Sequence, residues 1–240
     1  MKKMILWATV VALVATAMPA LAETLPATFG LRATSQHVWR GAVVADEISV
    51  QPFASVDFAG TGFGLDLWSS FAAQSREVWD QSDRVDVTAR YHRSLGAVWQ
   101  PLSFDVGYTE YTFPNLSVGD SHTGEVHLGL AAELPFFSAS LTGYRDVNVT
   151  ERSYIAAGFS PPASFLAGLP IPGLDLHFNV GFSDATDQWG FNDFSTILNW
   201  NLPLAGLVQA GPFVGFSYAD DSIDPENTNY WGGVSVSISN

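Results

Sequence analysis

Segments of about ten residues with alternating apolar and polar side chains recur along this chain, and they constrain its fold more than any other feature. Residues 83–93, 125–134 and 174–183 show the alternation most clearly, each with one apolar and one polar face. A period of two is typical of β-strands, because successive side chains point to opposite faces. Weaker segments complete a series of twelve expected strands, which span residues 27–38, 47–58, 62–72, 83–93, 102–112, 123–134, 137–146, 152–160, 174–183, 192–202, 207–218 and 229–239.

The length of these segments fits the thickness of an outer membrane. Ten residues at roughly 3.3 Å each, tilted by about 45°, cross an apolar band of about 25 Å. No stretch after residue 22 approaches the roughly 20 apolar residues that a membrane-spanning helix needs. The sequence therefore predicts one all-β domain over residues 23–240, a transmembrane up-and-down antiparallel β-barrel of about 12 strands.

The connections between the expected strands alternate between short and long, as they do in such barrels. Gly- and Pro-containing turns at residues 59–61, 133–135 and 203–206 are expected to face the periplasm. Residues 161–173 depart from the pattern, because this turn is long and apolar. The longer polar links are expected to face outward and comprise residues 41–46, 73–82, 113–122, 146–151, 184–191 and 219–228.

Aromatic residues concentrate where the expected strands meet their connections, which is typical of the two aromatic girdles of a membrane barrel. The expected outer girdle consists of Trp39, Trp79, Tyr111, Phe113, Trp189, Phe191, Tyr218, Tyr230 and Trp231. The expected inner girdle consists of Phe58, Phe63, Trp99, Phe136 and Trp200.

A soluble periplasmic β-sandwich is the competing fold, because its strands also alternate apolar and polar residues. Strand length, turn alternation and the girdles favour the barrel. The distribution of lysine favours it as well. Lys2 and Lys3 are the only lysines, whereas a soluble surface normally carries many.

The first 22 residues have the three regions of a signal peptide. Lys2 and Lys3 precede an apolar run over residues 5–17, and Ala20 and Ala22 form a small-residue cleavage site. We therefore expect export by a cleavable signal peptide, residues 1–22, and localisation in the bacterial outer membrane of a Gram-negative cell. The chain contains no cysteine, which excludes disulfides and argues against a lipid anchor.

The charge of the chain argues against a nucleic-acid partner. The formal net charge is −14, and it becomes about −16 when Lys2 and Lys3 are removed. Phosphate binding depends on clustered Lys and Arg side chains, and neither the charge nor the composition provides them.

The polar faces of the strands would line the interior of a barrel whose apolar faces meet lipid. Facing rows of acids and bases would then orient and filter a small polar or charged solute. In the alternative interpretation the charges pair across a narrow lumen and form a packed polar core. The candidate lumen-lining residues are Arg32, Asp57, Asp66, Arg84, Asp86, Arg90, His92, Asp105, Glu125, His127, Asp175 and His177, and the rings that would narrow a passage are Phe53, Trp68, Tyr144 and Phe213.

Trp39, Arg40 and Gly41 stand at the first expected outer link and suggest a specific role. A guanidinium there would bind a carboxylate or phosphate through two hydrogen bonds. In the alternative, Gly41 supplies a positive φ to a turn and Arg40 bonds nearby carbonyls.

Residues 34–41, with the strands at 50–56 and 62–68, resemble the TorF-like group of proteobacterial outer-membrane proteins, in which a first strand ends in an aromatic-Arg-Gly turn. The similarity in strand order and loop spacing covers most of residues 23–240. The resemblance implies an outer-membrane barrel with transport or pore formation as its expected activity.

Residues 231–240 are similar to the final-strand signal that the barrel-assembly machinery reads. Gly233, Val236 and Ile238 stand in matching places, but Asn240 stands where Phe is most common. The expected partners are therefore this machinery, outer-membrane lipid and lipopolysaccharide, together with a possible small solute.

The sequence gives only weak indications of catalysis or metal binding. His92 and Ser94 lie two apart, as in lipid A hydrolases, but on a polar face near the expected periplasmic end. The five histidines lack the paired spacing of a zinc site. Residues 219–227 offer oxygen ligands for Ca²⁺ without the pattern of an EF-hand, and a solvated loop is the alternative. We expect no catalytic residue, no metal and no cofactor.

The sequence thus predicts a small porin-like channel for passive passage of small polar or charged solutes. The alternative is a closed structural or surface-binding barrel without a conducting pore. A lipid A-modifying hydrolase is a remote alternative.

Overall fold

A computed structural model describes residues 25–73, 83–116, 121–162 and 173–240. Over these ranges the chain forms fifteen strands: β1 (Ala27–Thr34), β2 (His37–Trp39), β3 (Ala42–Ala45), β4 (Ser49–Asp57), β5 (Phe63–Ala72), β6 (Arg84–Ser94), β7 (Leu102–Thr112), β8 (His122–Leu134), β9 (Phe137–Asp146), β10 (Ser153–Ser160), β11 (Leu174–Ser183), β12 (Gly190–Trp200), β13 (Leu202–Ala205), β14 (Val208–Ala219) and β15 (Thr228–Ser239). In the same ranges there is no helix long and apolar enough to cross a membrane. The expected signal peptide, residues 1–22, lies outside the described residues.

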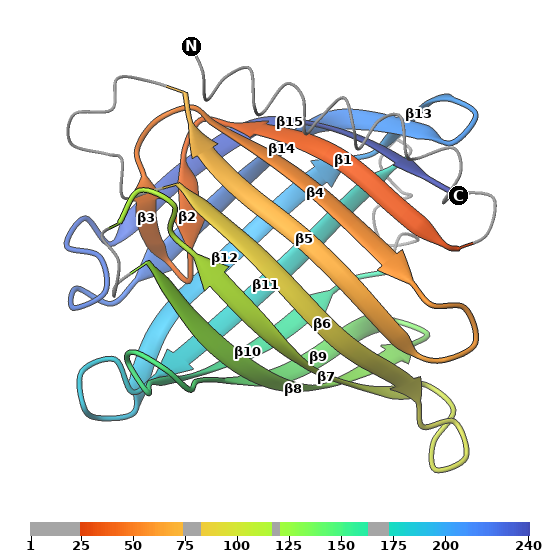
Figure 1. The fold of residues 1–240 in the computed structure, drawn as a ribbon, viewed down its shortest axis with the longest axis horizontal. Helices are drawn as coiled ribbons and strands as arrows, with labels where there is room; N and C mark the ends of the chain where they lie inside the picture. Colours follow the sequence, from red (N-terminus) through yellow and green to blue (C-terminus); the bar gives the residue numbers. More distant parts are fainter. Residues whose placement is uncertain (1–24, 74–82, 117–120, 163–172) are drawn as a thin grey trace.

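Twelve of the described strands close into one antiparallel barrel (Figure 1). The wall runs in the order β1, β4 to β12, β14 and β15, and β12 pairs directly with β14. The first and last strands close it, from Thr28 opposite Ser239 to Thr34 opposite Gly233. The predicted up-and-down antiparallel barrel of about 12 strands is confirmed, and the soluble sandwich is not the fold.

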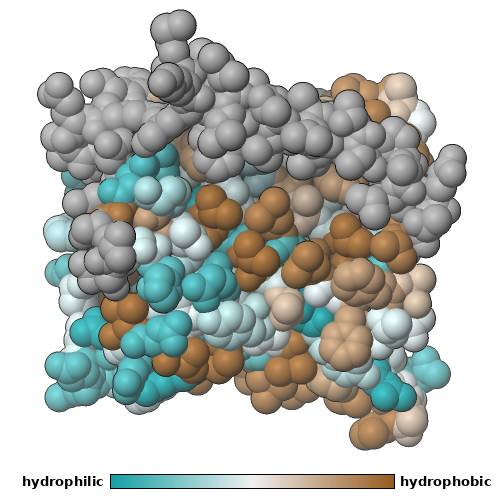
Figure 2. Space-filling model, viewed as in Figure 1, coloured by the Kyte–Doolittle hydropathy of each residue, from teal (hydrophilic) through white to brown (hydrophobic). Residues whose placement is uncertain are grey.

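The outside of the barrel is apolar and the inside is polar. Leu128 and Val214, with exposed fractions of 60% and 58%, point outward, whereas Arg84 and Glu125 are buried in the lumen. Hydrophobic side chains gather over the strands in Figure 2. Such a surface is stable where the outward face of each strand meets lipid.

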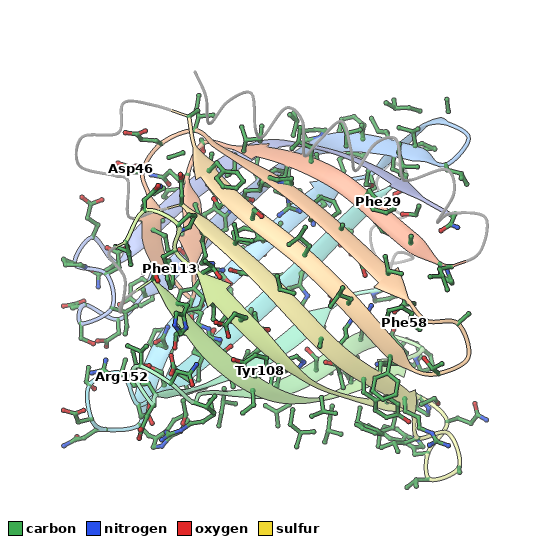
Figure 3. The ribbon with its side chains drawn as sticks, in the orientation of Figure 1. Phe29, Asp46, Phe58, Tyr108, Phe113 and Arg152 are labelled. Carbon is green, nitrogen blue, oxygen red and sulfur yellow. The ribbon has the colours of Figure 1, made fainter. Side chains whose placement is uncertain are left out.

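The predicted and observed strands agree within a few residues, except at the first outer link. Strand β1 ends at Thr34, not at residue 38, and β4 follows it directly in the wall. The chain between them forms the hairpin β2–β3, which lies off the wall (Figure 1). The prediction that residues 41–46 face outward is wrong for residues 41–45, which belong to the inward hairpin, whereas Asp46 lies at the end of the barrel that carries the long links (Figure 3). The run Ala42–Ala45 has no polar side chain and is buried more favourably inside the barrel.

One of the turns expected to face the periplasm also differs from its prediction. Residues 203–206 were expected to form the turn, but β13 occupies Leu202–Ala205 and pairs with β14. The turn falls on Gly206, whose φ of 55° suits glycine. Most of the long apolar turn predicted over 161–173 lies outside the described residues.

The aromatic girdles are partly as predicted. Phe58, Phe63, Trp99 and Phe136 are exposed at the end with short turns, and Trp189, Phe191, Tyr218 and Tyr230 are exposed toward the other end. Figure 3 places Phe58 at the first end, and Asp46, Phe113 and Arg152 at the second. Trp39, Tyr111 and Trp231 line lumen cavities instead, because their positions fall on the inward register of the chain. Trp79 lies outside the described residues.

Asn240 helps to close the seam between β1 and β15. Its side-chain oxygen accepts a hydrogen bond from Ala27 N at 2.6 Å, and its side-chain nitrogen donates to Leu25 O at 3.1 Å. An amide makes both bonds at once, which the aromatic residue common at this position would not do.

Candidate functional site

The hairpin β2–β3 enters the lumen at the end of the barrel that carries the long links (Figure 1). Its two-residue turn consists of Arg40 and Gly41, with φ values of 50° and 84°. Two positive φ values are the requirement of a type I′ hairpin turn. A Cβ on Gly41 would lie 2.6 Å from Asp193 Cβ, so glycine is required by space as well. The predicted turn role of Gly41 is confirmed.

Side chains of the wall hold the tip of the hairpin through its backbone oxygens. Asn192 Nδ2 donates to Arg40 O at 2.8 Å, and Asn229 Nδ2 donates to Gly41 O at 3.3 Å. Both asparagines are buried. These bonds satisfy carbonyl groups that would otherwise be desolvated inside the barrel.

The link between β14 and β15 contacts β3 through the side chain of Asp224. Asp224 accepts hydrogen bonds from Asn229 Nδ2 at 2.9 Å and from Val43 N at 3.4 Å. Burial raises the pKa of Asp224, but the hydrogen bonds from Asn229, Glu226 N and Val43 N outweigh burial and lower it. The carboxylate is therefore charged at neutral pH, and the link is an anchor for the hairpin.

Arg40 reaches from the hairpin to the opposite wall. Its Nη2 lies 2.8 Å from Glu125 Oε1, and Tyr111 donates a hydrogen bond to the same oxygen at 2.8 Å. The guanidinium also lies over the rings of Tyr154 at 4.3 Å, Trp39 at 4.5 Å and Tyr144 at 4.8 Å. The interpretation in which Arg40 bonds nearby carbonyls is wrong, because its partner is a carboxylate 85 residues away.

A second ion pair lies beside the hairpin. Arg84 Nη2 is 2.9 Å from Asp86 Oδ2, and its guanidinium faces the rings of Trp39, Trp68 and Tyr111. Within the described chain, Arg84 Nε and Asp86 Oδ1 have no hydrogen-bond partner, although both atoms are buried. Buried polar atoms need partners, and water in the lumen would provide them.

The inner half of the lumen carries two further charged clusters. Arg90 bonds Asp57 at 2.6 Å and Asp66 at 2.7 Å. His127 Nε2 lies 2.6 Å from Asp105 Oδ1. Eight of the predicted lumen residues are therefore held in ion pairs or a triad. Arg84 and Asp86 pair along β6, Arg90 joins Asp57 and Asp66 across β4 to β6, His127 pairs with Asp105 across β7 and β8, and Glu125 pairs with Arg40 of the hairpin.

The other four predicted residues lie apart. Arg32, on β1, lies over the ring of Phe213, on β14, at 4.5 Å, and these two strands flank β15. His177 bonds Ser160 Oγ through Nδ1 at 2.8 Å, and Asp175 precedes it on the same inward register. His92 is exposed near the inner end of β6. Contact of any of these residues with a solute stays a prediction.

Two cavities meet at the hairpin. The outer cavity, of about 390 Å³, is lined by Phe113 and Arg152 among others, and the inner one, of about 370 Å³, by Asp66 and Thr88. A third cavity of about 230 Å³ lies between the hairpin and β1. The outer and inner cavities share the lining residues Trp39, Arg40, Arg84, Tyr111 and Tyr154. These five shared residues form the constriction of the lumen.

Sequence reasoning missed several residues that build the constriction. Asn192, Asn229 and Tyr154 were not singled out, although all three fall on inward registers. Polar amides at inward positions beside outer links are the signal that marks them. The apolar run Ala42–Ala45 inside a supposed outer link is a second signal.

Ser94 belongs to the His92 and Ser94 pair that resembles the arrangement of lipid A hydrolases in the sequence. Ser94 Oγ accepts a hydrogen bond from Gly96 N at 3.2 Å and lies at the inner end of β6. Over the described ranges, no group of three or more His, Asp or Glu side chains is arranged to hold a metal ion.

The architecture is a closed twelve-stranded antiparallel barrel with an inward hairpin. A solved structure named as KdgM porin has the same fold, with a TM-score of 0.58 and 14% identity, over 89% of this chain and 99% of that one. KdgM porin in complex with disordered oligogalacturonate gives a TM-score of 0.56 and 15% identity, with coverage of 89% and 99%. No protein-family model matches this chain, and no curated protein matches it by sequence.

Proposed function

We propose that this protein is an outer-membrane channel for passive passage of small polar or charged solutes, with its narrowest point at the constriction. The observation that carries the proposal is the meeting of two cavities at Trp39 and Arg40 inside a closed barrel. A lumen built only as a packed core would leave no cavities of this size on both sides of the hairpin.

The polar atoms of the lumen support a hydrated passage. Arg84 Nε, Asp86 Oδ1 and His37 Nδ1 have no hydrogen-bond partner in the described part of the chain. All three atoms belong to residues that line the inner cavity or the cavity between the hairpin and β1. Water that passes through the lumen would satisfy them, which a dry core would not.

The apolar outer surface supports a position in the outer membrane, with lipid and lipopolysaccharide as neighbours. Recognition of β15 by the barrel-assembly machinery belongs to the same proposal, as does membership of the TorF-like group. The oligogalacturonate of the solved KdgM complex is an acidic saccharide. An acidic saccharide would be repelled by the inner lumen of this chain, in which carboxylates outnumber arginines.

Recording from planar lipid bilayers tests the proposal. The purified barrel is expected to give discrete conductance steps. The steps are expected to change in size when Arg84→Gln and Asp86→Asn are combined, because Arg84 lines the constriction and Asp86 lines the inner cavity beside it. The double variant keeps the net charge. Heat-modifiable mobility in a detergent gel shows that each sample is folded. A folded barrel without steps would favour the closed structural alternative.

A further inference from the structure

The inner half of the lumen is unusually rich in carboxylates. Asp57, Asp66, Asp105 and Asp175 lie in the inner halves of their strands on the inward register, and the cation among them is Arg90. The side chains of Asp57, Asp66 and Asp105 keep exposed fractions of 52%, 33% and 32%. Charges this accessible act on a solute in the passage.

The carboxylates surround the passage instead of lining one side of it. Asp66 belongs to β5 and Asp175 to β11, and these strands are six positions apart in the closed wall of twelve. They therefore lie on opposite sides of the barrel. Asp105, on β7, stands between them along the wall. A solute that crosses the inner half meets negative charge from several directions.

The arginines of the lumen do not offset this charge. Arg90 bonds two carboxylates, and Arg40 and Arg84 each pair with one carboxylate and are covered by aromatic rings. Arg32 lies over Phe213 nearer the middle of the barrel. In the described chain, no arginine pairs with Asp105 or Asp175. The inner half thus keeps a net negative charge after every arginine is counted.

We propose that this lumen selects cations over anions and that its solutes are small cations. The proposal rests on the proposed channel function. Rings of acidic side chains in a narrow, low-dielectric passage concentrate cations and repel anions. The paired charges at the constriction contribute little net field. The preference is therefore set by the four carboxylates of the inner half, which outnumber Arg90.

The zero-current potential in a KCl gradient across a planar bilayer tests this inference. We expect a zero-current potential with the sign of a channel that is more permeable to K⁺ than to Cl⁻. In a gradient of choline chloride we expect a zero-current potential of the same sign. Asp105→Asn combined with Asp175→Asn is expected to lower the K⁺ to Cl⁻ permeability ratio severalfold. As a matched control, Asp187→Asn combined with Glu226→Gln removes two charges from exposed outer links and is expected to change the ratio little.

The outcomes separate this inference from the channel proposal. Conductance with a preference for Cl⁻, or a ratio that the lumen variant leaves unchanged, overturns the cation inference and leaves the channel intact. A folded barrel that passes no current overturns both. A ratio that falls equally in the lumen and control variants also contradicts the inference, because the outer links would then set the selectivity.

Discussion

Replacing the hairpin with a short turn is expected to raise the single-channel conductance severalfold while leaving the barrel closed. The hairpin separates the two main cavities of the lumen, so its removal joins them into a wider passage. Thr34 and Ser49, which flank the replaced segment, are already paired across β1 and β4. An Asn-Gly link in place of residues 35–48 therefore makes a normal two-residue hairpin loop.

The measurement is conductance in planar bilayers, combined with heat-modifiable mobility to show that the variant is folded. An Asn-Gly link in place of residues 184–189 is the matched control, because Ser183 and Gly190 are also paired and this link lies at the same end of the barrel. The control is expected to keep the original conductance. If the hairpin variant folds and conducts like the original protein, the hairpin is not the constriction.

The second large effect is expected at Arg40. Arg40→Ala is expected to lower the free energy of unfolding by about 3 kcal/mol, because it leaves the buried Glu125 carboxylate without its cation. This value is at the lower end of the usual cost of breaking a buried ion pair, since the Arg40 side chain keeps an exposed fraction of 20%. Urea unfolding of the barrel in lipid vesicles measures the change.

Two further variants show whether the loss comes from the buried charge. Arg40→Met combined with Glu125→Gln removes both charges and is expected to recover much of the stability. Arg145→Ala breaks an exposed ion pair with Asp184, at 3.7 Å, and is expected to cost less than about 1 kcal/mol. Equal losses in Arg40→Ala and Arg145→Ala would contradict the role of the buried pair.

The wall of the barrel could be predicted from the sequence because its signal is local. Each strand alternates apolar and polar residues on its own, so β6 and β11 could be located without knowledge of their neighbours. Inward and outward faces follow from the same alternation once lipid is taken as the solvent. The proximity of Asp105 and His127, in contrast, can be predicted only when the pairing register of β7 and β8 is known.

The hairpin could not be predicted in this way. A strand of the wall and a strand that leaves the wall show the same alternation of apolar and polar residues before residue 38. The sequence therefore predicts that the first strand continues past Thr34. The bond of Arg40 to Glu125 and the bond of Asn229 to Gly41 join segments far apart in the chain. Such contacts depend on closure of the barrel, which no local pattern encodes.

A lone cysteine in the lumen gives the most direct test of a water-filled passage, because the chain has no cysteine of its own. Thr88 lines the inner cavity, and its neighbour Val87 points toward lipid with an exposed fraction of 41%. A charged methanethiosulfonate reagent is expected to reduce the current through Thr88→Cys and to leave Val87→Cys unchanged. A folded barrel that carries no current, or a current that the reagent reduces only in Val87→Cys, would contradict a channel through this lumen.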